Sequence, residues 1–163
     1  MQKLSSDGSI KFLRYWLPLL VWLGVIFFGS TDLMSAEHTS RFIVPFLRWL
    51  KSDISIETLA SIHFVIRKCA HLSEYAILAL LLLRASIYVI NFKCSMPTLY
   101  VCVWVTCFLV AITDEFHQTF VVSRSACATD ILIDSAGAIL GLLVGAIFER
   151  RHSTNVRRAI TGP

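Results

Sequence analysis

Four long apolar runs, separated by segments that carry most of the charge, constrain this chain more than any other feature of its sequence. The runs extend from Tyr15 to Ser30, Ala70 to Ile90, Pro97 to Thr113 and Ile131 to Phe148. A helix needs about 20 apolar residues to cross a bilayer, and each run is close to that length. The sequence therefore predicts an all-α polytopic membrane protein, folded as a bundle of four transmembrane helices.

The first run is the shortest, and Phe12 and Leu13 lengthen it if the Arg14 side chain snorkels to the headgroups. A cleaved signal peptide is the alternative, because the run follows a basic start. Residues 29–32, Gly-Ser-Thr-Asp, offer no small-x-small cleavage motif, which favours a retained helix. The predicted spans are residues 12–30, 70–90, 97–113 and 131–148 of one membrane domain, 1–163.

The composition of the chain limits its partners. Of the 163 residues, 56% are hydrophobic and 16% charged, and the mean hydropathy is +0.69, far above that of a soluble domain. The net charge of +4 comes from basic residues at the ends and in loops, which does not indicate nucleic acid. The five cysteines form no C-x-x-C pair. We expect membrane lipids as partners, and no metal or cofactor.

Basic residues indicate the orientation. One set lies before the first span, between the second and third, and after the fourth: Lys3, Lys11, Arg14, Lys93, Arg150, Arg151, Arg157 and Arg158. The positive-inside rule makes that side cytoplasmic, so we expect a bacterial cytoplasmic membrane with both termini inside. The other side carries Arg41, Arg48, Lys51, Arg67, Lys68 and Arg124, which weaken this bias without reversing it.

The first outer loop is long and has an interfacial composition. Its segment from Arg41 to Lys51 mixes bulky apolar residues with cations. Because Pro45 interrupts helical regularity, we expect one or two short surface helices and no further crossing. Ser55 offers a helix start, and the pattern from Ile56 can run without a break into the second span.

Polar residues collect near the outer boundary of three spans. Lys68, His71 and Tyr75 share one face of the second helix, and Glu74 lies beside it. With the predicted topology they meet residues from the third and fourth spans and the loop between them. The candidate ligand-binding residues are Lys68, His71, Glu74, Tyr75, Asp114, Glu115, Gln118, Arg124, Asp130 and Asp134.

Ionisable groups inside the boundary need partners, because insertion at the bilayer centre costs about 2.5 to 3.5 kcal/mol. The compensating cations or donors are expected to be Lys68, His71 and Arg124. The alternative is a structural network that pins helices together. Capping of the fourth helix would alone account for Asp130.

Several residues are given ordinary structural roles. His117 and Arg67 are expected to be exposed interfacial residues, and Arg84 to be a snorkelling side chain near the cytoplasmic end. A stripe on the last helix, Gly137, Gly141 and Gly145, permits close approach to a neighbouring helix. That neighbour could belong to the same chain or to a second copy, which leaves a homo-oligomer open.

Together these residues resemble the signature of the VanZ-like family. The matching positions are Lys68-x-x-His71-x-x-Glu74-Tyr75, Asp114-Glu115-x-x-Gln118, Arg124, and Asp130 followed by Gly137 and Gly141. The resemblance implies a four-helix membrane protein of the bacterial envelope, in a family named for a member associated with teicoplanin resistance. The chain departs from the family pattern at Val122-Ser123, usually Pro-Gly, and at Asp134, commonly Asn.

The favoured function is a non-enzymatic envelope protein whose outer polar pocket binds a lipid headgroup, an envelope precursor or a glycopeptide-type amphiphile. The alternative is a membrane hydrolase or transferase acting on lipid-linked envelope material. Its base would be His71 or Glu74, and Asp114 or Glu115 would be its acid or a metal ligand. That reading lacks a nucleophile motif, and His71-x-x-Glu74 is a weak metal signal. Transport by associated copies is a third possibility.

Overall fold

The computed structural model describes residues 2–31, 36–89, 95–121 and 127–161. These form five α-helices: α1 (Gln2–Gly29), α2 (Ala36–Leu50), α3 (Ile56–Val89), α4 (Met96–Gln118) and α5 (Ala128–Thr161). There is no strand among these residues. The helices α1, α3, α4 and α5 are each long and apolar enough to cross a membrane. The predicted all-α polytopic fold with four spans is therefore confirmed.

Each of the four helices covers a predicted span to within one residue at its end and extends beyond it on at least one side. The helix α3 has 34 residues, which at a rise of 1.5 Å per residue gives about 51 Å, well above a hydrocarbon thickness of about 30 Å. It starts as the sequence predicts, because the Ser55 hydroxyl accepts a hydrogen bond from the Thr58 N–H at 3.2 Å. It then continues from Ile56 to Val89 without a break.

The interfacial segment forms one helix, α2, that continues through Pro45. A proline inside a helix leaves the carbonyl four residues earlier without its N–H partner. Both Pro45 and Arg41 are exposed, so that carbonyl can be hydrated. The side chains of Phe46 and Trp49 are also exposed, next to the cation Arg48, as an interfacial helix requires.

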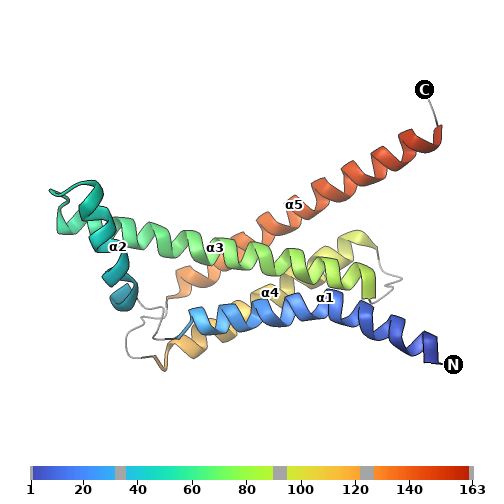
Figure 1. Cartoon of the computed structure of the whole chain (residues 1–163), viewed down its shortest axis with the longest axis horizontal. Helices are drawn as coiled ribbons and strands as arrows, with labels where there is room; N and C mark the ends of the chain where they lie inside the picture. The colour runs from blue at the N-terminus through green and yellow to red at the C-terminus, as the bar shows by residue number, and fades with distance from the viewer. Residues whose placement is uncertain (1, 32–35, 90–94, 122–126, 162–163) are drawn as a thin grey trace.

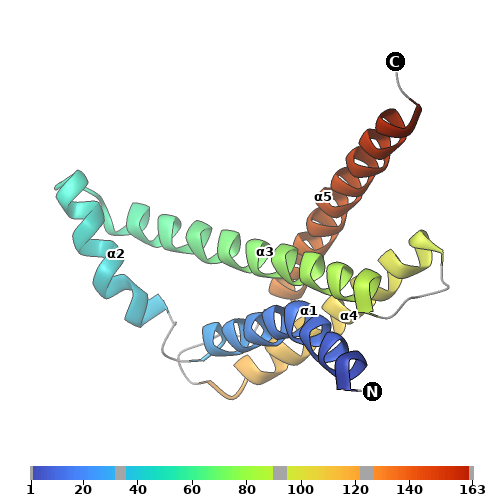
Figure 2. The same cartoon turned by 45° about the vertical axis from the view of Figure 1, so that its right-hand side comes forward.

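The central helix of the bundle is α3, which contacts every other helix and packs most extensively against α5 (Figure 1). The apolar core includes Leu19, Ile26, Tyr75, Leu78, Ala79, Leu83, Ala85, Leu99, Val103, Cys107, Ala111, Ala138 and Leu142. Many large apolar side chains on the four long helices remain exposed, as lipid-facing residues do. Both chain termini lie at the end of the molecule opposite α2 (Figure 2).

The glycine stripe of α5 lies against α3 within the same chain. A Cβ atom at Gly137 would overlap the carbonyl oxygen of Leu72, and one at Gly141 would overlap that of Ala76. At Gly145 it would lie 2.8 Å from a methyl group of Leu83. The absence of side chains here lets the two helix backbones approach closely. The sequence left open whether the stripe packs on a helix of the same chain or of a second copy. In the structure it packs on α3 of the same chain.

Candidate functional site

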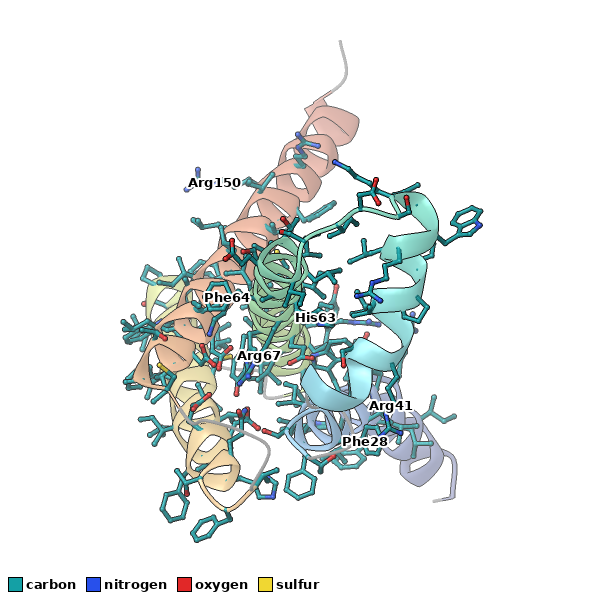
Figure 3. The ribbon with its side chains drawn as sticks, turned by 90° about the vertical axis from the view of Figure 1, so that its left-hand side faces the viewer. Phe28, Arg41, His63, Phe64, Arg67 and Arg150 are labelled. Atoms are coloured by element: carbon teal, nitrogen blue, oxygen red, sulfur yellow. The ribbon has the colours of Figure 1, made fainter. Side chains whose placement is uncertain are left out.

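Polar residues that are buried or partly buried gather at one end of the bundle, where α1 and α4 end, α5 begins and α3 passes through. We call these residues the polar cluster: Ser30, Arg67, Lys68, His71, Glu74, Tyr75, Asp114, Glu115, Gln118, Asp130 and Asp134. Figure 3 views the molecule from this end, with Arg67 pointing in among the helix ends. The structure thus brings together all the candidate ligand-binding residues that it describes.

An ionic contact joins α3 to the first turn of α5. The Lys68 ammonium contacts one carboxylate oxygen of Asp130, and Arg67 Nη2 lies 3.5 Å from the other. The Asp130 side chain is only 1% exposed. Capping alone therefore does not account for Asp130, and the expectation that Arg67 is an ordinary exposed residue is wrong. Both corrections have one cause, the close packing of α3 on α5 that buries this carboxylate beside two cations.

A second contact between the same helices lies one turn further into the bundle. The Nδ1 atom of His71 lies 3.1 Å from Oδ1 of Asp134, whose side chain is 0% exposed. A carboxylate buried this deeply requires a hydrogen-bonding partner, and the imidazole supplies it. In this pair His71 acts as the compensating donor that the sequence predicted.

The Asp114 carboxylate is surrounded by neutral donors. The Ser30 hydroxyl donates to Oδ1 of Asp114 at 2.6 Å, and the Gln118 amide donates to Oδ2 at 3.0 Å. The same amide nitrogen donates to Ser30 Oγ at 3.0 Å, while its carbonyl oxygen accepts from Arg67 Nη2 at 3.4 Å. Asp114 thus has partners other than the nearby cations that we expected. Ser30 was missed because one serine after an apolar run looks like an ordinary turn residue.

The Glu115 side chain reaches the segment that precedes α5. One carboxylate oxygen, Oε2, accepts the backbone N–H of Cys127 at 2.9 Å. The other, Oε1, is buried and has no hydrogen-bond partner in the described part of the chain. No sequence signal identifies Cys127, because its backbone and not its side chain makes this contact.

Two neighbouring residues of α3 complete the cluster. The backbone carbonyl of Glu74 accepts a hydrogen bond from the Trp22 indole at 2.9 Å, and its carboxylate lies against Gly29. These contacts attach the end of α1 to α3. The Tyr75 side chain is 0% exposed, and within the described residues its hydroxyl has no hydrogen-bond partner.

Arg124 and His117, which the sequence also singled out, lie outside the polar cluster as the structure describes it. Arg124, with the departure at Val122-Ser123, lies outside the described residues. His117 is half-buried against the Phe27 ring, at a centroid distance of 4.7 Å, so the expectation that it is simply exposed is wrong. Across the described ranges, no group of three His, Cys, Asp or Glu side chains is arranged to hold a metal ion.

Four membrane-spanning helices with a buried charged cluster at one end define a polytopic membrane protein. The chain matches the model of the VanZ/LLP1 family over residues 15–149, and it belongs to that family. The matched segment starts in α1 and ends in α5, so it contains the whole polar cluster. Neither a curated protein nor a solved structure matches the chain.

Proposed function

We propose that the polar cluster binds the headgroup of an amphiphile at the outer surface of a bacterial cytoplasmic membrane. The amphiphile is a membrane lipid, a lipid-linked envelope precursor or a glycopeptide-type antibiotic. Support for the orientation comes from the basic residues around the termini, at the end of the bundle opposite α2. The cluster is then outside, where all three ligands are found.

One observation carries the proposal: charged side chains from three helices lie together, buried or partly buried, at one end of the bundle, and not all of their polar atoms are paired. Arg67 is the clearest case, since its side chain is 26% exposed while its buried Nε has no partner among the described residues. A partly exposed guanidinium can bind a phosphate or carboxylate through the N–H groups that reach the surface. Its neighbours Asp130 and Gln118 hold it in place.

Ligand binding by the full chain in nanodiscs tests the proposal. We expect Arg67→Ala and Lys68→Ala to weaken binding of at least one lipid or glycopeptide by about tenfold, the loss of one charge-assisted contact. Lys51→Ala is the matched control, because Lys51 is an exposed cation beyond α2 and outside the cluster. Equal losses in all three variants would indicate non-specific electrostatic attraction and contradict the proposal.

A test in cells links the cluster to susceptibility. A deletion strain is challenged with teicoplanin, vancomycin and detergents, then complemented with the wild type, Glu74→Ala or Arg124→Ala. If this chain affects teicoplanin susceptibility through the cluster, only the wild type restores growth. Restoration by both variants would show that the effect does not depend on these side chains and would contradict a role of this site in susceptibility.

A hydrolase or transferase acting on lipid-linked substrates is the second candidate, and the His71–Asp134 contact is the observation that favours it. A carboxylate on Nδ1 orients an imidazole so that Nε2 can act as a general base. Incubation of the purified protein with lipid-linked envelope substrates tests this candidate. Turnover that falls by orders of magnitude in His71→Gln would support catalysis, and absence of any product would contradict it.

A further inference from the structure

Three buried oxygen atoms of the polar cluster lack a hydrogen-bond partner. They are the Tyr75 hydroxyl, Glu115 Oε1 and Asp134 Oδ2, on side chains that are 0%, 4% and 0% exposed. The statement covers the described part of the chain. Buried polar atoms are nearly always paired in folded proteins, so three in one cluster point to a partner that the described residues do not supply.

The charge around these atoms indicates which kind of partner fits. Within the described residues the cluster has five carboxylates, on Glu74, Asp114, Glu115, Asp130 and Asp134, and only the cations Arg67 and Lys68 besides His71. Both cations already contact Asp130, while Asp114 is held by neutral donors and Asp134 by the imidazole. A phosphate entering among these carboxylates would meet like charge, whereas a cation would be attracted.

The position of Tyr75 also favours a cation over a phosphate. It lies close enough to Asp114 and Asp134 to interact with both electrostatically, and Glu115 is similarly close to Asp114 and Asp130. A tyrosine hydroxyl both donates and accepts, and carboxylate oxygens only accept. The unpaired atoms are therefore suited to a ligand that carries several N–H donors and no acceptor.

We infer that the group entering the polar cluster is a primary ammonium of the bound amphiphile. A primary ammonium has three N–H donors and no acceptor, which matches oxygen atoms in an acidic site. This inference rests on the proposed function and names the chemistry of its ligand. Aminophospholipids and amphiphiles with an amino sugar share the group. The half-exposed Arg67 at the edge of the cluster remains available for a phosphate of the same headgroup.

Lipid competition in phosphatidylcholine nanodiscs tests the inference with the full chain. Affinities are measured by native mass spectrometry for phosphatidylethanolamine and phosphatidylglycerol, and for dodecylammonium against dodecyltrimethylammonium. We expect each primary ammonium to bind at least about tenfold more tightly than its counterpart without N–H donors. A preference in the alkylammonium pair alone would support the ammonium and make its source something other than an aminophospholipid.

Two conservative variants connect the preference to the cluster. Glu115→Gln and Tyr75→Phe are nearly isosteric, and each should reduce the ammonium preference several-fold. Glu57→Gln is the matched control, because Glu57 is an exposed carboxylate of α3 outside the cluster. Should Glu115→Gln fail to fold, Tyr75→Phe still provides the result, since it removes only an unpaired hydroxyl.

The outcomes separate this inference from the proposed function. Saturable binding that Arg67→Ala weakens, with no ammonium preference or with a preference unchanged in both variants, would overturn the inference and leave headgroup binding in place. Absence of saturable binding by any of these amphiphiles would overturn the proposed function itself.

Discussion

His71 on α3 and Asp134 on α5, 63 residues apart in the chain, lie 3.1 Å apart between Nδ1 and Oδ1 at the buried end of the helix pair. The contact sits where the glycine stripe of α5 begins to pack on α3. Close backbone packing and a buried polar contact therefore occur together. The close packing makes the contact possible, because the short Asp134 side chain reaches the imidazole only where the two backbones lie close together.

The first prediction concerns this pair. His71→Ala leaves the Asp134 carboxylate buried without its hydrogen-bonding partner, so we expect the free energy of unfolding to fall by about 3 to 5 kcal/mol. Asp134→Asn removes the charge and retains an acceptor oxygen, so the expected loss is about 1 kcal/mol. Unfolding by SDS titration in mixed micelles measures both. Similar losses in the two variants would show that the buried charge is not what His71 stabilises.

The contact between Lys68 and Asp130 predicts strong coupling. Lys68→Met leaves the buried Asp130 carboxylate with Arg67 alone, and we expect a loss of about 3 kcal/mol in the free energy of unfolding. The double variant with Asp130→Leu removes both charges and should lose less than the two single variants together, by about 1 to 3 kcal/mol. Additive losses in this double-mutant cycle would mean that the pair contributes no net coupling.

Substitution in the glycine stripe should separate packing from helix propensity. At Gly141 an added methyl group would overlap the backbone of Ala76, so Gly141→Ala should cost about 1 to 3 kcal/mol of stability. Gly24 has nothing within 4 Å of the same methyl position, and Gly24→Ala should be neutral or stabilise α1 by up to about 1 kcal/mol. Unfolding transitions of the two variants provide the comparison, and a neutral Gly141→Ala would refute the close approach.

The Cys127 thiol should react at a lower pH than an ordinary cysteine. A hydrogen bond with the Thr129 hydroxyl lowers the pKa of this exposed thiol, so more of it is thiolate at a given pH. Thr129→Val should raise the pKa, slow alkylation near neutral pH and have little effect well above the usual cysteine pKa of about 8.5. Iodoacetamide rates across this range, in a chain with Cys127 as its one cysteine, measure the change. Overlapping profiles would exclude a contribution from the hydroxyl.

Cysteine labelling tests the proposed orientation. Cys127 is exposed immediately before α5, at the end of the bundle that holds the polar cluster. A membrane-impermeant maleimide should therefore label Cys127 in intact spheroplasts. The control is Cys94, in the connection between α3 and α4, which should react only after permeabilisation. The reverse pattern would place the cluster on the cytoplasmic side.

Much of the fold could be predicted because membrane helices are selected by local composition. The uninterrupted helix from Ile56 and the four spans follow from apolar length and from the Ser55 helix start. The continuation of α2 through Pro45 did not follow, because local sequence cannot tell whether the freed carbonyl is hydrated. Helix periodicity also predicted that Lys68, His71 and Tyr75 share one face of α3. It could not predict which helix packs against that face.

Pairing within the cluster depended on contacts between distant segments. Arg67 and Asp130 looked like ordinary interfacial and capping residues, and only the packing of α3 on α5 made them ionic neighbours. Ser30 became a partner of Asp114 because the end of α1 lies beside the end of α4.

Four helical spans could be predicted from the amino-acid sequence, because insertion into a bilayer depends on apolar length and charge along each helix. Which carboxylate contacts which donor, and which oxygen atoms stay unpaired, followed only from how the helices pack. Those pairings depend on rotation and crossing of helices, and distances of a few ångströms between side chains are not encoded in any single segment.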